Sequence, residues 1–427
     1  MPIVENDVER FEAAQLVADL RDLDLVQMEL MDQRGITSRV AKRSKELDLA
    51  LLELPNLDAE IGRLRQDAKL VEDATEDRRR WLRTFRDELA DGSVTITLSD
   101  EDLVVFALRQ FFRHEYRGWS PTFDKHHVLD LLEGWPYHKG GIGHPDTVAH
   151  VDIPAPSGGP GPRVGIADTA IFPHDDLVGR YVGDQVGELP RPAPPTAGHA
   201  TFIAGLILQR APDAELVVRE VLGVDGVNRS SWAVAVKLMG FLLEDVSVLN
   251  MSFGCLVADS LPPLILRRAV ERLSRGMVLV AAAGNNGNLP GRNKAGVTAR
   301  TPAWPAAFDD VVAVGAYDPH VPEHQRAQFS PHLQLVDLLA PGVRVQSTYL
   351  SGEVRIHDRN DDTGEAEDKG TETFDKPGYA TWDGTSFAAA SVSGEIAARM
   401  GVSRMSSHEA LDALLESPGD IMPFPLA

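Results

Sequence analysis

Residues 163–168 read Arg-Val-Gly-Ile-Ala-Asp, a short apolar run that ends in a carboxylate. Four similar runs follow along the chain, at residues 215–218, 246–249, 277–280 and 311–314, with helical stretches between them. Continuous apolar strands that alternate with helices are typical of a buried parallel sheet with helices on both faces. This part of the sequence therefore predicts an α/β fold.

Polar residues that can do chemistry stand near the ends of these runs. Asp168 closes the first run, His199 opens a later apolar helix, and Asn285 follows the run at 277–280. In open α/β sheets, functional sites lie at the carboxyl ends of the strands. Each residue also has a purely structural interpretation: a helix cap or turn for Asp168, a packed side chain for His199, and an Asn-Gly turn for Asn285.

A serine stands near the C-terminal end, in the stretch Gly-Thr-Ser-Phe-Ala at residues 384–388. The small and apolar residues around it predict a helix that begins close to this serine, Ser386. The dipole and the free backbone N–H groups of a helix N-terminus stabilise negative charge, which suits a reactive hydroxyl. On its own, the stretch is equally compatible with two elements that pack closely.

In the order Asp, His, Asn, Ser, these four residues resemble the subtilisin-like serine peptidases, the subtilases, whose triad is carried by an α/β sheet. The resemblance spans about residues 162–418 and includes His174, which matches a structural histidine of the family. Further segments match in order, at residues 248–254, 304–305, 311–315, 326–330 and 339–342.

The resemblance implies a serine endopeptidase that forms an acyl-enzyme with a peptide or protein substrate. Ser386 would be the nucleophile, His199 the general base, and Asp168 the residue that orients the histidine. Asn285 would donate a hydrogen bond to the oxyanion. A catalytically silent scaffold or binding protein that keeps the peptidase fold is the alternative.

The same resemblance implies a substrate that lies as an added strand along the protein. Ser252, Phe253 and Gly254 would pair with it and form one wall of the S1 pocket. Ala283 and Gly284 would form the opposite wall.

The sequence departs from the family pattern beside the histidine and the serine. Ala200 follows the histidine in place of glycine, and Phe202 replaces a second histidine. Ala390 and Ser391 replace the usual Pro-His after the serine. None of these changes removes a reacting atom, so we expect an active enzyme.

The N-terminal region shows a different pattern, with apolar residues spaced by three and four. This spacing predicts a mainly α-helical N-terminal domain, in which residues 1–92 form a helical hairpin or a coiled-coil-like region. If they form a coiled coil, residues 8–92 would bind a regulatory protein or a second copy of the chain. The long helical patterns argue against the compact α/β propeptide common among secreted subtilases. The apolar positions are Leu47, Leu51, Leu54, Leu57, Ile61, Leu64, Ala68 and Val71.

The remaining boundaries follow from composition. Residues 93–154 are expected to form a small α-rich segment and residues 155–162 a Gly/Pro linker. The peptidase domain is expected at 163–418, followed by a C-terminal tail at 419–427. Residues 351–378 form an acidic insertion that we expect to be a solvated loop, and a rim of the substrate cleft that favours basic substrates is the alternative.

The charge of the chain limits its partners. With 42 Lys and Arg against 64 Asp and Glu, the formal net charge is −22. Nucleic acid and anionic membranes bind clustered positive charge, so neither is expected as a partner. The sequence shows neither a secretory signal nor an apolar run of membrane-spanning length, and Cys255 is its only cysteine. These features together predict a cytoplasmic protein without an intramolecular disulfide.

No cofactor and no metal site are expected. His126 and His127 are adjacent, but adjacent side chains diverge on a helix or strand, and no cluster of further ligands surrounds them. The acidic insertion lacks an ordered ligand spacing for calcium.

Overall fold

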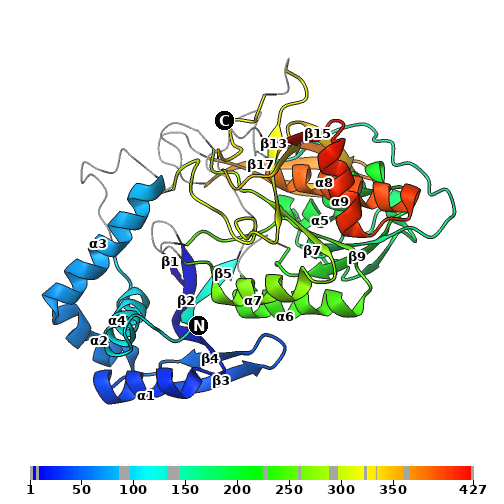
Figure 1. Cartoon of the computed structure of the whole chain (residues 1–427). Helices are drawn as coiled ribbons and strands as arrows, with labels where there is room; N and C mark the ends of the chain where they lie inside the picture. Colours follow the sequence, from blue (N-terminus) through cyan, green and yellow to red (C-terminus); the bar gives the residue numbers. More distant parts are fainter. Residues whose placement is uncertain are drawn as a thin grey trace.

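The computed structural model (Figure 1) contains an eight-stranded sheet in its C-terminal part, in the order β19-β14-β13-β12-β11-β7-β9-β8. Neighbouring strands are parallel except for β14 and β19. The strands are β7 (Arg163–Asp168), β8 (Tyr181–Gly183), β9 (Glu215–Glu220), β11 (Val248–Met251), β12 (Val278–Ala282), β13 (Val312–Tyr317), β14 (Leu338–Pro341) and β19 (Met422–Pro423). The structure describes residues 3–5, 9–85, 97–129, 131, 144–224, 229–257, 261–287, 297–321, 325–332, 334–359 and 366–424.

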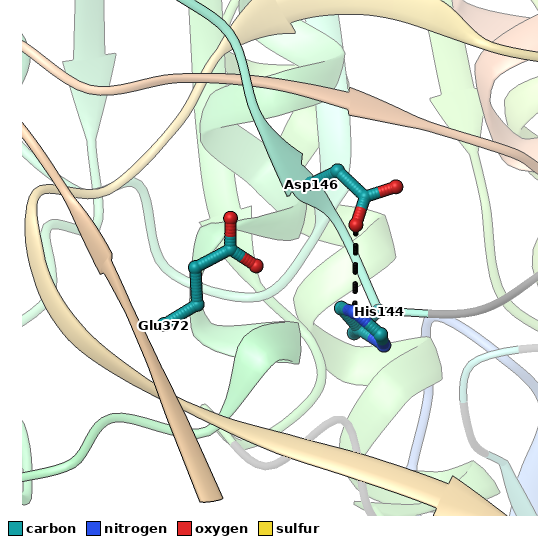
Figure 2. A group of neighbouring side chains, drawn as sticks. All are labelled: His144, Asp146 and Glu372. Atoms are coloured by element: carbon teal, nitrogen blue, oxygen red, sulfur yellow. Dashed lines mark ion pairs between the residues drawn. The ribbon is translucent and has the colours of Figure 1, made fainter. Parts of the chain in front are cut away.

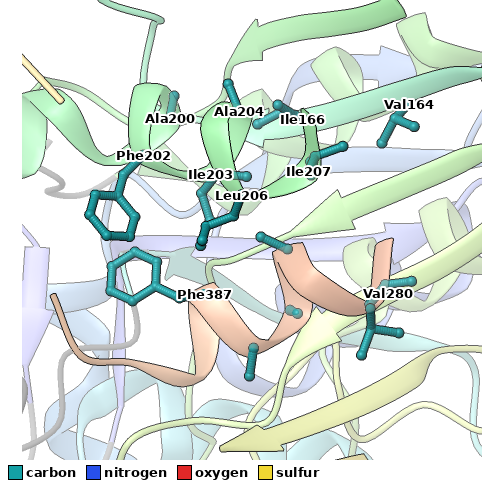
Figure 3. Close-up of a cluster of buried hydrophobic side chains, with 14 of the residues drawn as sticks. Val164, Ile166, Ala200, Phe202, Ile203, Ala204, Leu206, Ile207, Val280 and Phe387 are labelled. Atoms are coloured by element: carbon teal, nitrogen blue, oxygen red, sulfur yellow. The ribbon is translucent and has the colours of Figure 1, made fainter. Parts of the chain in front are cut away.

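Helices cover both faces of this sheet, because its strands are apolar towards both sides. Val164 and Ile166 of β7 join one core cluster, whereas Leu249 of β11 joins another on the opposite face. Figure 3 shows the first cluster, where Phe202 faces Phe387. The predicted α/β fold is therefore confirmed. The helices are α5 (His199–Arg210), α8 (Thr385–Ser403) and α9 (Ser407–Glu416), then α6 (Ser231–Met239) and α7 (Leu264–Leu273), with the 3-10 turns η2 (Asp175–Leu177), η3 (Pro195–Gly198) and η4 (Gly240–Leu243).

Two smaller sheets lie beside the main one. A three-stranded sheet has the order β15-β18-β6, and a separate hairpin is formed by β16 and β17. This hairpin occupies the acidic insertion at 351–378, so the expected solvated loop is corrected to a pair of antiparallel strands. The strands are β6 (Asp146–Thr147), β15 (Val345–Thr348), β16 (Gly352–Arg359), β17 (Ala366–Phe374) and β18 (Tyr379–Trp382).

The N-terminal region contains a second large sheet, with the order β10-β5-β2-β4-β3, and β1 is paired to β2. All of its pairs are antiparallel. Without β1 and β10, the chain order is βαββαβ with three helices in the second crossover, which is a ferredoxin-like topology. The elements are β1 (Ile3–Glu5), β2 (Arg10–Asp19), α1 (Leu23–Arg34), β3 (Arg39–Ser44), β4 (Leu49–Glu53), α2 (Leu57–Gln66), α3 (Ala68–Phe85), α4 (Asp100–Glu115), β5 (Phe123–Leu129) and β10 (Arg229–Ser230).

This sheet corrects the expected helical hairpin or coiled-coil-like region at residues 1–92, and with it the argument against a compact α/β domain. The apolar positions that looked like one helical stripe are divided among β4 with its flanking residues, α2 and α3. Leu49 and Leu51 point to the cluster shared with the peptidase part, whereas Ala50 and Leu52 point to the N-terminal cluster. A strand buried on both faces is apolar throughout and lacks the alternation by which a half-buried strand is found.

The N-terminal sheet packs on α6 and α7, so these helices lie between the two sheets (Figure 1). Val17, Leu51 and Leu129 share a buried cluster with Trp232 and Leu264 of these helices. The two-residue strand β10 from the peptidase part adds to β5 at the edge of the N-terminal sheet. One apolar core therefore serves both regions.

Two side chains of β5 also bind the N-termini of these helices. The backbone N–H of Leu264 in α7 donates to Asp124 Oδ2 at 3.1 Å. The backbone N–H of Trp232 in α6 donates to His126 Nε2 at 3.3 Å. Burial lowers the pKa of His126 to about 3, which keeps this ring nitrogen available as an acceptor. His126 is thus a structural acceptor, and its neighbour His127 lies within ion-pair distance of Glu9 and Asp124.

The other predicted segments also acquire local structure. Residues 93–154 include α4, β5 and β6, so this segment is not purely α-rich. In the linker at 155–162, the N–H and Oγ of Ser157 donate to Asp213 at 2.6 and 2.7 Å. The expected C-terminal tail contributes β19 to the main sheet. Within the described part of the chain, no helix has both the length and the apolarity needed to cross a membrane.

Candidate active site

Asp168 and His199 are hydrogen-bonded at the carboxyl end of the central strand β7. His199 Nδ1 lies 2.8 Å from Oδ1 and 2.9 Å from Oδ2 of Asp168. The backbone N–H of Thr169 also donates to Asp168 Oδ1, at 2.7 Å. Because a carboxylate only accepts hydrogen bonds, this pairing assigns the proton to Nδ1 and leaves Nε2 unprotonated in the neutral ring. Both side chains are buried, and Asp168 is fully inaccessible.

Aromatic rings surround the imidazole of His199. The ring of Trp382 meets it edge-on at 5.6 Å, and the ring of Phe387 lies at 5.4 Å. Phe202, which replaces the second histidine of the family pattern, packs on Phe387 at 4.5 Å between ring centroids. The replacement therefore extends an apolar wall on one side of His199. The sequence offered no signal for this role of Trp382.

Ser386 lies in the first turn of α8, as predicted from its small neighbours. Its side chain is mostly covered, with 5% of the residue exposed. Its carbonyl oxygen accepts a hydrogen bond from Ser252 Oγ at 3.1 Å. Phe387, the next residue, contacts the ring of His199, so the beginnings of α5 and α8 lie together. The helix N-terminus supplies the N–H groups expected there.

Asn285 is held against the same turn. Its Oδ1 accepts from the backbone N–H of Thr385 at 3.0 Å and from Thr385 Oγ1 at 2.9 Å. Thr385 Oγ1 also lies 3.0 Å from the carbonyl oxygen of Gly284. With its oxygen engaged by Thr385, the amide turns its Nδ2 donor away from that residue. The side chain of Asn285 is therefore fixed beside Ser386.

The predicted substrate-binding residues follow two neighbouring strands. Ser252, Phe253 and Gly254 come after β11, whereas Ala283 and Gly284 come after β12, and these strands pair in parallel. All five residues are buried in the structure. The two candidate walls therefore leave the same edge of the sheet, next to Ser386.

A polar network that the sequence did not reveal supports this edge. Ser252 Oγ accepts from Asn250 Nδ2 at 2.9 Å, and Asn250 Oδ1 accepts from Ser393 Oγ at 3.2 Å. The network ties the end of β11 to α8 beneath Ser386. Its members lie too far apart in the sequence for a local pattern to indicate their contact.

His174 has a structural surrounding, in line with the prediction that it is not the base. Its Nε2 lies 2.8 Å from the carbonyl oxygen of Gly378, and its Nδ1 accepts from the N–H of Asp176 at 3.2 Å. Cys255 is buried, and its backbone forms a two-way bridge with Trp304 at 2.9 Å.

Comparisons with known proteins agree with this geometry. The model of the subtilase family matches residues 159–417, well over half of the chain. Subtilisin BL of Lederbergia lenta is 35% identical over 205 residues, which cover 45% of this chain and 67% of subtilisin BL. An alkaline protease of Alkalihalobacillus alcalophilus is 35% identical over 205 residues, covering 45% of this chain and 48% of that protein. The chain thus spans about two thirds of subtilisin BL and slightly less than half of the alkaline protease.

Among solved structures, the chain is similar to fervidolysin from Fervidobacterium pennivorans, a keratinolytic enzyme related to subtilisin. The TM-score is 0.54 at 16% identity, and the match covers 97% of this chain and 60% of fervidolysin. At this identity the similarity concerns the fold, and it includes the N-terminal region. The match to the family model and the identity to subtilisin BL show that the chain belongs to the subtilase family of serine endopeptidases.

Proposed function

We propose that this subtilase cleaves peptide bonds with Ser386 as nucleophile, His199 as general base and Asp168 as the residue that orients the imidazole. The contact of 2.8 Å between His199 Nδ1 and Asp168 carries the proposal. With Nδ1 donating to Asp168, Nε2 takes the proton of Ser386 Oγ as the hydroxyl attacks the carbonyl carbon. The imidazolium then delivers this proton to the leaving amine.

The developing negative charge is stabilised by donors beside the serine. We assign this role to Asn285 Nδ2 and to the backbone N–H of Ser386 at the start of α8. The substrate pairs as an added strand with Ser252, Phe253 and Gly254. Its P1 side chain enters between that segment and Ala283 and Gly284.

The assignment is tested with a fluorophosphonate probe, which modifies an activated serine. Wild-type protein should be labelled, and Ser386→Ala should not. Ser391→Ala is the matched control, because Ser391 lies on the same helix with its Oγ bonded to the carbonyl oxygen of Phe387 at 3.1 Å. Asp168→Asn should lower kcat by about 10⁴-fold.

The outcomes separate the two candidate functions. Labelling that persists in Ser386→Ala would reject the serine assignment. A folded wild-type protein that is never labelled, even after limited proteolysis of its N-terminal region, would favour the silent scaffold.

We further propose that the N-terminal region controls the peptidase. Its support is the docking of the N-terminal sheet on α6 and α7 and the shared core at Val17 and Trp232. Control through this region requires either its removal or a change in its docking. A partner protein that binds residues 8–92 is a second way to achieve the same change.

Intact masses of wild-type and Ser386→Ala protein test whether removal is needed. A shortened wild-type chain beside a full-length Ser386→Ala chain would support self-cleavage. A full-length wild-type chain with full activity would contradict obligatory processing. A cytoplasmic location is also proposed, since a lone buried thiol at Cys255 suits a reducing compartment.

A further inference from the structure

Three side chains of metal-ligating type meet on the surface beside β18, outside the catalytic residues. They are His144, which stands just before β6, Asp146, the first residue of β6, and Glu372 of β17 (Figure 2). One ligand atom from each residue lies within 4.8 Å of the others. The two segments are far apart in the sequence, so no motif could indicate the cluster.

Backbone pairing holds the two segments in place. β6 is an edge strand that pairs with β18, where Asp146 stands opposite Thr381. The backbone N–H of Thr147 donates to Glu372 Oε1 at 3.0 Å, which orients this carboxylate next to β6. A hydrogen bond of this kind, from outside the ligand set, is typical of metal sites, where it positions the ligand.

The charges of the cluster are not balanced within the protein. His144 Nε2 lies 3.4 Å from Asp146 Oδ1, and Figure 2 marks this ion pair. Among the residues that the structure describes, no lysine or arginine forms an ion pair with Asp146 or Glu372. Two carboxylates close together repel each other, and a bound cation removes this repulsion.

We propose that His144, Asp146 and Glu372 bind one divalent transition-metal ion, with Zn²⁺ as the best fit. One imidazole nitrogen and two carboxylate oxygens are ligands that Zn²⁺ accepts, and a water molecule completes a tetrahedral set. Zn²⁺ lies about 2.0–2.2 Å from such atoms, so binding draws the three side chains slightly together. The ion replaces the pair between His144 and Asp146. This site is independent of the proposed catalytic assignment.

The ion would cross-link two parts of the molecule that are far apart in the sequence. On one side is the segment that leads from the N-terminal region into the linker at 155–162. On the other side is the β16–β17 hairpin. Binding is therefore expected to stabilise β6 at the edge of its sheet.

The test uses the full-length Ser386→Ala protein, in which self-cleavage cannot change the chain. After treatment with a chelator, Zn²⁺ is titrated by calorimetry, and Co²⁺ serves as a spectroscopic probe for a nitrogen and oxygen ligand set. We expect one equivalent of Zn²⁺ to bind and to raise the Tm. His144→Ala and Glu372→Gln should each weaken binding by at least about tenfold and abolish the rise in Tm.

Two substitutions serve as matched controls. His150→Ala removes an exposed imidazole from the same segment, and Glu353→Gln removes an exposed carboxylate from the same hairpin. Both should bind Zn²⁺ like the parent protein. Absence of binding in the parent, equal affinity in Glu372→Gln, or binding of Ca²⁺ in place of Zn²⁺ would each overturn the proposal.

Discussion

At the scale of single residues, the catalytic candidates were predictable because their order along the chain is informative. Asp168, His199, Asn285 and Ser386 stand at strand ends and helix starts, which short sequence patterns indicate. Their surroundings were not predictable. The wall formed by Trp382 arises from packing between distant segments, which local spacing does not encode.

Asp383, three residues before Ser386, is expected to make stability depend on pH. Burial raises the pKa of its carboxyl to about 6, from an ordinary value of 3.8. The folded state therefore binds the proton more tightly than the unfolded chain. Its contribution is full below pH 4 and is lost as the pH rises through 6. Asp383→Asn should raise the free energy of unfolding at pH 8 by up to about 3 kcal/mol and should leave it nearly unchanged at pH 4.

Urea unfolding of Ser386→Ala protein at both pH values measures this effect. Asparagine keeps an oxygen for the N–H of Arg344, which donates to Asp383. Asp375→Asn, at an exposed aspartate, should not change the dependence on pH. An equal gain at pH 4 and pH 8 in Asp383→Asn would show that ionisation is not the cause.

At the scale of elements, five neighbouring strands of the main sheet were predicted, namely β7, β9, β11, β12 and β13. The strands β8, β14 and β19 at its two edges and those of the N-terminal sheet were missed. The apolar run of β7 is easy to recognise because a Gly/Pro linker precedes it and Asp168 ends it. Four similar apolar runs follow along the chain. β4 has no such repetition, and burial on both faces removes its alternation. The acidic insertion was equally ambiguous, because charged strands exposed to solvent resemble loops in composition.

The β16–β17 hairpin lies close to the segment before His199. The N–H of Ala193 donates to the carbonyl oxygen of Glu353 at 2.8 Å, and the N–H of Arg355 donates to that of Ala193 at 2.8 Å. If the carboxylates of the hairpin face bound substrate, they attract basic side chains. Glu353→Gln should then raise KM for peptides rich in Lys and Arg by about two- to fivefold. KM for a neutral peptide should not change.

Peptide hydrolysis at low and high salt tests this prediction. The effect should shrink at high salt, because exposed charges are screened. Glu271→Gln on α7 is the control, because α7 packs in the core cluster on the opposite face of the main sheet from the hairpin. A similar rise in KM for basic and neutral peptides would contradict a role in selectivity.

At the scale of the whole molecule, the two sheets share a core, which the sequence did not reveal. We expect the N-terminal and peptidase parts to unfold together. Leu51→Ala, which opens a cavity in the shared cluster, should lower the free energy of unfolding by about 2–5 kcal/mol. Leu52→Ala opens a cavity of the same chemistry in the N-terminal cluster alone.

Tryptophan fluorescence and circular dichroism, followed in urea on Ser386→Ala protein, show whether the N-terminal and peptidase parts unfold together or separately. A single shared transition, shifted by both substitutions, is the expected result. Two separate transitions, with only the first moved by Leu52→Ala, would mean that the regions unfold independently.

The position of β4 between two layers has a consequence during synthesis on the ribosome. The N-terminal region has all of its strands from β1 to β5 and its helices α1 to α4 once residue 129 has emerged. The helix α7, which covers its sheet, ends only at Leu273. For the time needed to add the intervening residues, on the order of ten seconds, one apolar face of the nascent sheet stays uncovered. The N-terminal sheet is thus synthesised before the helices that cover it, and α6 and α7 can pack on it as soon as they are synthesised.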